Sequence, residues 1–118
     1  MYHVQDAGRT IRLWYFLYSD PPTPDQFRSL AVQGVTYDNP VAAYRSQGIS
    51  AWATEDIARA KGTRPRVNQG RWQFLAALNL TTDGIAIRIE RTGKQAGHFT
   101  IFADPRTMYK SVVQVLPL

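Results

Sequence analysis

Residues 48–60 read GISAWATEDIARA, and this stretch predicts a short strand that turns directly into a helix. Thr54 is placed to accept a hydrogen bond from an amide of the first helical turn. Glu55 and Asp56 follow it, where the helix dipole favours negative charge. Ser50 lies on the strand just before this turn. Because strand-to-helix junctions often line a ligand cleft, we expect a functional site here.

The rest of the chain predicts an α+β fold. Before the junction we expect an aromatic-rich strand at residues 11–18, a helix at 24–31 capped by Thr23, and either a short helix or a loop at 41–45. After it we expect strands at 72–80, 85–90, 98–103 and 111–116, with a hairpin turn at 82–84 and a helical turn after Asp104. Residues 1–118 therefore form a single domain with a mainly antiparallel sheet, or two splayed sheets with a cleft, and two or three short helices.

The amino-acid composition excludes several classes of protein and of site. With 44% hydrophobic and 12% aromatic residues the 118-residue chain is typical of a globular domain, and it contains no apolar run of the roughly 20 residues needed to span a bilayer. Cysteine is absent, which excludes disulfides and thiolate metal sites, and the two histidines lack zinc-site spacing. Neither a Walker loop nor a dinucleotide fingerprint occurs. We expect a cytoplasmic protein with no metal and no membrane partner.

The chain is basic, with a formal charge of +5 and a pI of about 9.9. This balance favours anionic partners such as nucleotides or nucleic acid, although solubility alone also explains many basic domains. One segment without acidic residues carries five of the cations: Arg59, Lys61, Arg64, Arg66 and Arg71. It predicts either a nucleic-acid contact or a solvated face.

His98 is the first candidate for chemistry, because it follows Gly97 at the start of a strand and shares a face with Thr100. Its imidazole could act as a general acid or base, or it could simply bond a neighbouring backbone carbonyl. Ser50 and Trp52 share a face of the earlier strand. A hydroxyl beside an indole could hold a base or nicotinamide ring, or the indole could be a core residue.

Three further residues could meet a nucleotide. Glu90 ends a strand, where it could polarise a ribose hydroxyl or pair with a neighbouring arginine at the surface. Tyr15 and Arg45 offer an aromatic face and a guanidinium for a phosphate-bearing ligand, although each is also an ordinary surface or sheet-end residue.

Three segments together resemble small proteins of the ADP-ribosyl (NAD-cleaving transferase) fold: LWYFLY at 13–18, GISAWAT at 48–54 and GHFTIF at 97–102. The resemblance implies two sheets that splay into a cleft, with NAD lying across it. Where that family usually has an arginine or histidine on the first strand, this sequence has Tyr15. His98 or Glu90 would have to replace the family's late catalytic glutamate.

The leading hypothesis is a domain that binds an anionic nucleotide, with NAD as cofactor and ADP-ribosyl transfer or NAD cleavage as the activity. Catalysis would fall to His98 and Glu90, and the cofactor would be held by Tyr15, Arg45, Ser50, Trp52 and Thr100. The alternatives are a small basic RNA-binding or toxin-like nuclease module and an interaction domain with an exposed tryptophan. The leading hypothesis requires Ser50 and His98 to open onto one shared hollow.

Overall fold

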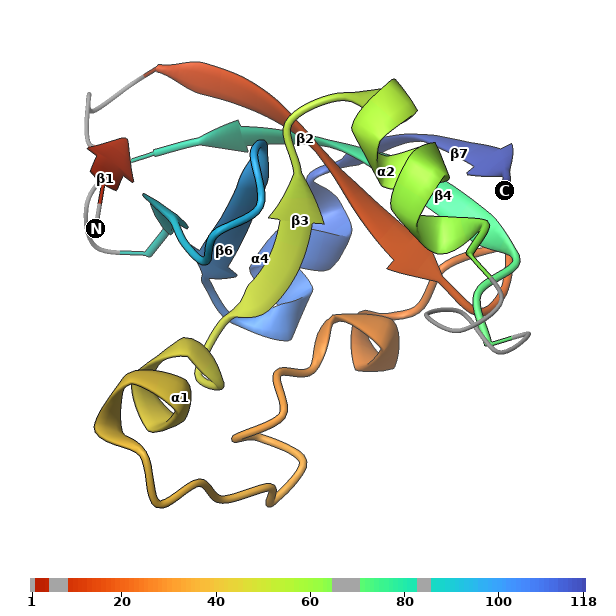
Figure 1. Ribbon diagram of the computed structural model, residues 1–118. Helices are drawn as coiled ribbons and strands as arrows, with labels where there is room; N and C mark the ends of the chain where they lie inside the picture. The colour runs from red at the N-terminus through yellow and green to blue at the C-terminus, as the bar shows by residue number, and fades with distance from the viewer. Residues whose placement is uncertain (1, 5–8, 65–70, 83–85) are drawn as a thin grey trace.

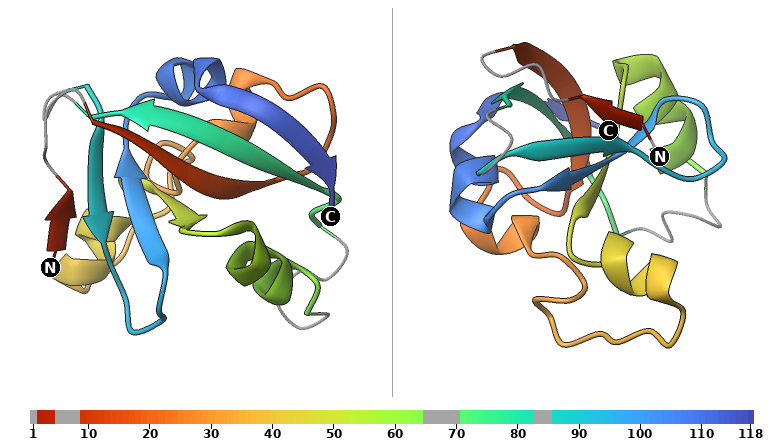
Figure 2. Two further views of the ribbon diagram at one scale, coloured as in Figure 1. Left: turned by 90° about the horizontal axis from the view of Figure 1, so that it is seen from above. Right: turned by 90° about the vertical axis from the view of Figure 1, so that its left-hand side faces the viewer.

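A computed structural model describes residues 2–4, 9–64, 71–82 and 86–118, which fold around one antiparallel sheet (Figures 1 and 2). The strand order within this described part is β1-β5-β6-β3-β2-β4-β7. The strands are β1 Tyr2–Val4, β2 Thr10–Leu17, β3 Ile49–Trp52, β4 Phe74–Thr81, β5 Arg88–Arg91, β6 His98–Phe102 and β7 Val112–Pro117. The predicted α+β class is confirmed.

Short helices flank the sheet: η1 Pro24–Phe27, α1 Pro40–Arg45, α2 Glu55–Gly62 and α4 Pro105–Lys110, of which η1 is a 3-10 turn. The predicted caps form, since Oγ1 of Thr54 accepts from the Ile57 amide at 3.2 Å and Oδ1 of Asp104 accepts from the Thr107 amide at 2.8 Å. Asn39 caps α1 in the same way, so the 41–45 segment is helical. None of the helices in the described ranges is long and apolar enough to cross a membrane.

The helix predicted at 24–31 ends early, at Phe27. The amide of Ala31 donates to the carbonyl of Ser46 at 3.0 Å, which draws the chain toward the end of α1 rather than into another turn of helix. Phe27 is buried as expected, but Leu30 is 45% exposed, and Thr23 makes no side-chain cap bond. The predicted helix was therefore wrong beyond its first turn.

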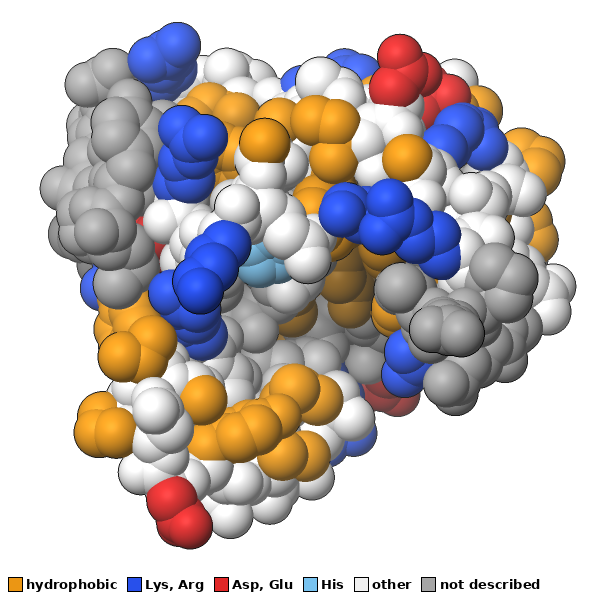
Figure 3. Space-filling view, in the orientation of Figure 1, with side chains coloured by type: hydrophobic (Ala, Val, Ile, Leu, Met, Phe, Trp, Pro, Cys, Tyr) orange, Lys and Arg blue, Asp and Glu red, His pale blue; other side chains and the backbone are white. Residues whose placement is uncertain are grey.

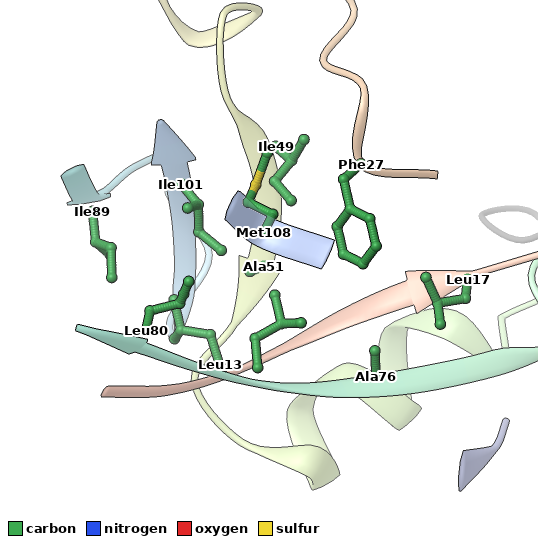
Figure 4. Close-up of a cluster of buried hydrophobic side chains, with 11 residues drawn as sticks. Leu13, Leu17, Phe27, Ile49, Ala51, Ala76, Leu80, Ile89, Ile101 and Met108 are labelled. Atoms are coloured by element: carbon green, nitrogen blue, oxygen red, sulfur yellow. The ribbon is translucent and has the colours of Figure 1, made fainter. Parts of the chain in front are cut away.

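Strand β2 is covered on both faces, as its sequence predicted. One face presents Leu13 and Leu17 to a cluster that includes Phe27 and Met108 (Figure 4). The other face presents Trp14 and Phe16 to a cluster that includes Ala58 of α2 and Leu75 of β4. Accordingly, α4 and η1 lie on one side of the sheet and α2 on the other (Figure 2).

The hairpin predicted between β4 and β5 is wrong. Strand β4 pairs with β2 along eight positions and with β7 on its other edge, whereas β5 pairs with β1 and β6. Both edges of β4 are therefore occupied by strands other than β5. Residues 83 and 84 of the predicted turn lie outside the described ranges.

The two halves of the sheet are joined weakly in the middle. Strand β3 pairs with β6 at four positions, but with β2 in register only where Trp52 faces Trp14. Away from that point β2 and β3 diverge, which Figure 1 shows as an open angle between them. The chain thus forms a single sheet with an internal split, rather than two separate sheets, and the split creates the space described next.

Candidate functional site

A cleft of about 730 Å³ lies in the split between β2 and β3. Its walls include Tyr15 and Phe16 of β2, Ser50 and Trp52 of β3, and His98 at the start of β6. Figure 3 shows the hollow, with the histidine on its wall among hydrophobic and basic side chains. Ser50 and His98 therefore border one shared hollow, the condition that the nucleotide hypothesis required.

The His98 ring is fixed by two contacts with Thr92. Its Nδ1 lies 3.0 Å from the carbonyl oxygen of Thr92 and 3.1 Å from the hydroxyl oxygen of the same residue. Because a carbonyl only accepts, Nδ1 carries the proton, and in the neutral ring Nε2 keeps its lone pair. Burial lowers the pKa of His98, and the positive charge of Arg45 lowers it further, although the bond to Thr92 opposes both. The ring is therefore mainly neutral at pH 7, and Nε2 is left as a hydrogen-bond acceptor.

The backbone conformation and the close packing next to His98 require a glycine at position 97. Its φ is +75°, and a Cβ built there would lie 2.7 Å from Cδ1 of Ile57 in α2. Only glycine meets both conditions, as the sequence suggested.

Trp52 and Ser50 form the floor of the cleft on β3. The indole meets the His98 ring edge-on, with 4.8 Å between centroids, and Nζ of Lys61 lies 5.8 Å from the indole centroid. Trp52 is buried and packs against Trp14, so the core interpretation of this residue holds, yet it also borders the cleft. Ser50 is exposed and borders the cleft.

The cleft is strongly basic. Six cationic residues border it: Arg28, Arg45, Lys61, Arg64, Arg71 and Lys94. Among the described residues that line it there is no aspartate or glutamate. Like charges around a concave surface reinforce one another, so the cleft attracts anions.

The predicted basic segment is divided by the fold. Lys61, Arg64 and Arg71 border the cleft, but Arg59 instead donates to Glu55 at 2.7 Å and to the carbonyl of Pro117 at 2.9 Å. Arg66 lies outside the described ranges. Three of the five cations of this segment therefore contribute to one site, together with residues distant in sequence.

Two predicted site residues lie in the same row of the sheet as Ser50 but not in the cleft. Ser50, Thr100 and Glu90 are directly opposite one another across β3, β6 and β5. Thr100 is buried and its hydroxyl lies 2.7 Å from that of Thr92. Glu90 is 0% exposed, and its Oε1 accepts a 2.6 Å hydrogen bond from the hydroxyl of Tyr44 in α1. Helix α1 thus covers this row beyond Ser50.

Tyr15 borders the cleft with its ring, while its hydroxyl donates to the carbonyl of Gln26. Burial is the main cause that raises the pKa of Tyr15, and nearby Tyr18 adds to it, so the phenol stays protonated. Tyr15 therefore offers an aromatic surface and not a charged group.

Sequence reasoning missed Arg28 and Lys94. Lys94 lies in the loop that precedes His98, so its position next to a candidate residue was a usable signal. Arg28 follows η1 and borders the cleft because the chain turns toward α1. No local sequence pattern predicts this turn.

Within the described ranges, no group of three or more His, Asp or Glu side chains is arranged to hold a metal ion. Comparison with protein-family models, curated proteins and solved structures found no match.

Proposed function

We propose that the cleft between β2 and β3 binds an anionic nucleotide, with NAD as the leading candidate. The observation that carries the proposal is the set of six lysine and arginine residues, without a described carboxylate, around a hollow that Trp52 and His98 border. Lysine and arginine are the usual partners of phosphate oxygens, and aromatic walls suit a planar base.

Different residues of the cleft suit the phosphate, base and ribose parts of a nucleotide. Arg45 and its neighbouring cations would pair with phosphate oxygens, and the exposed hydroxyl of Ser50 can donate to or accept from a base edge. Tyr37 borders the cleft and is 42% exposed, so its ring could stack on a base. The Nε2 atom of His98 would accept from a ribose hydroxyl, because Nδ1 is engaged by Thr92.

Transfer of ADP-ribose, which the resemblance implies, is less well supported than binding. Departure of nicotinamide leaves positive charge on the ribose, which a carboxylate stabilises and a ring of cations opposes. Glu90 belongs to the same row as Ser50 but lies under Tyr44, so its use would require α1 to move. We therefore restrict the proposal to binding.

Isothermal titration calorimetry with NAD and with AMP tests the proposal. We expect binding heat and a dissociation constant that rises with salt, because the contacts are between charges. Lys61→Gln should weaken binding, whereas Arg106→Gln, which changes an exposed arginine of α4 outside the cleft, should not. Absence of both heat and thermal shift at millimolar nucleotide would overturn the proposal.

A second candidate function is binding of single-stranded RNA, favoured by three cations and an aromatic residue that border the cleft: Lys61, Arg64, Arg71 and Trp72. A basic groove with aromatic side chains is the common design of single-strand binders. If RNA is the ligand, Arg64→Ala should weaken oligonucleotide binding and reduce its salt dependence. Salt-insensitive or undetectable binding of oligonucleotides by the intact protein would count against it.

A further inference from the structure

The geometry points to a ligand that carries two phosphate groups well apart from each other, one on each side of β3. This inference rests on the proposed nucleotide binding and adds to it a class of ligand. It is carried by the distribution of the cations around the cleft, which come from opposite sides of the split in the sheet.

Arg45 and Lys94 form one pair of cations, called here the β6-side pair. Arg45 ends α1, and the chain that follows is pressed onto β6, since a Cβ on Gly48 would lie 2.4 Å from Cγ2 of Thr100. Lys94 lies in the loop between β5 and β6. Both residues border the cleft, and the charge of Arg45 is felt by His98 at the start of β6.

Arg64 and Arg71 form a second pair, the β2-side pair. Arg64 follows α2, whose last residue Gly62 is packed so closely on Phe16 of β2 that a Cβ there would lie 2.5 Å from the ring. Trp72 stacks on the same Phe16 ring at 4.6 Å, and the guanidinium of the adjacent Arg71 lies 4.7 Å from the Trp72 ring centroid. This pair is therefore anchored to β2.

Strand β3 separates the two pairs in the order β6-β3-β2. Two strand spacings already amount to roughly 10 Å, and β2 and β3 diverge beyond Trp14 and Trp52, which widens the gap. Between the pairs lies the floor of Ser50 and Trp52 on β3, with Lys61 above the indole. Two adjacent phosphates of a pyrophosphate share one oxygen and cannot serve both sides fully, whereas a nucleotide with a further phosphate on its ribose can.

Two matched ligand pairs, each differing by one ribose phosphate, test the inference on the intact protein. The first is AMP with adenosine 3′,5′-bisphosphate, and the second is NAD with NADP. We expect the added phosphate to lower the dissociation constant at least about tenfold in one or both ligand pairs, and which pair responds distinguishes a mononucleotide from a dinucleotide ligand.

Double variants that neutralise one cation pair each show which cations bind the added phosphate. Both Arg45→Gln with Lys94→Gln and Arg64→Gln with Arg71→Gln should bring the affinity ratio toward one, because each removes both cations of one pair. Arg106→Gln with Lys110→Gln, which changes two exposed residues of α4, should keep the ratio. Near-ultraviolet circular dichroism verifies the fold of each variant, and Arg64→Gln alone replaces the second double variant if loss of Arg71 disturbs Trp72.

A ratio near one in the unaltered protein, with AMP or NAD still bound, overturns the two-phosphate ligand and leaves nucleotide binding intact. Collapse of the ratio in only one double variant likewise overturns it, because it indicates a single phosphate subsite. Failure of all four nucleotides to bind removes the proposed function and this inference together.

Discussion

Trp14 of β2 and Trp52 of β3 form the one register pair that joins these two strands in the described part of the chain. Both indoles are buried in the same cluster, with Phe16, Leu75 and Ala77. Away from this contact the two strands separate, and the cleft lies in the split between them. The tryptophan contact thus sets the apex of the site as well as part of the core.

Removal of the Trp14 side chain should be costly. We expect Trp14→Ala to lower the free energy of unfolding by about 3–5 kcal/mol, because it empties a fully packed position at the apex. Trp72→Ala is the matched comparison, since Trp72 stacks on Phe16 but is only half-buried and should cost less. Urea denaturation followed by circular dichroism measures both. Equal losses of unfolding free energy in the two variants would show that Trp14 contributes no more to stability than Trp72.

Gly48 permits the close approach of β3 to β6. A Cβ at this position would lie 2.4 Å from Cγ2 of Thr100 and 2.7 Å from the carbonyl oxygen of Ile101, and the second of these is backbone. We expect Gly48→Ala to lower the free energy of unfolding by about 1–3 kcal/mol, since the strand must shift. Gln47→Ala, at the exposed neighbouring position, serves as the control. An unchanged urea midpoint for Gly48→Ala would contradict the packing described here.

Local signals in the sequence predicted local structure well. The caps at Thr54 and Asp104 were predictable because each depends on an amide three residues away. Ser50 and His98 were found because strand ends beside a cap or a glycine can be recognised within a few residues. The pairing of β4 with β2 was not, since alternation of apolar residues marks a strand without naming its partner.

Long-range contacts explain what the sequence could not predict about the site. A glutamate flanked by arginines is typical of a surface, yet Glu90 is covered by Tyr44, which lies 46 positions away in the sequence. Arg28 reaches the cleft because the chain after η1 is drawn toward Ser46. Both results depend on how α1 is laid against the sheet, which is decided by tertiary packing and not by residue spacing.

The bond between Tyr44 and Glu90 should support the fold. Because Oε1 of the buried carboxylate accepts from the phenol at 2.6 Å, we expect Tyr44→Phe to lower the free energy of unfolding by about 1.5–3 kcal/mol. The same bond is the main cause that raises the pKa of Tyr44. Tyr109→Phe, at an exposed tyrosine of α4, is the control for loss of a hydroxyl. A thermal melt in which both variants match the unaltered protein would argue against a supporting role.

Glu90→Gln separates a structural role of this carboxylate from a role in the cleft. Since Glu90 does not border the cleft, we expect the variant to lose stability while its nucleotide dissociation constant changes by less than about twofold. Calorimetry with AMP, performed well below the melting temperature of the variant, gives this comparison. A large loss of affinity in a folded Glu90→Gln protein would instead place the carboxylate within reach of the ligand.

The titration of His98 should make stability depend on pH in a defined direction. Burial first, and then the charge of Arg45, lower its folded-state pKa below the ordinary value of 6.5. As the pH falls, the unfolded chain therefore takes up the proton first, so the contribution of His98 to stability is complete above pH 6.5 and is lost as the pH falls through the folded-state pKa. Urea midpoints between pH 8 and pH 5 should decline less in His98→Gln than in the unaltered protein. In an NMR titration the His98 midpoint should lie below 6.5 and rise in Arg45→Gln but not in Arg106→Gln, and a midpoint at or above 6.5 in the unaltered protein would show that the ring is not buried against Thr92 and Trp52 as described.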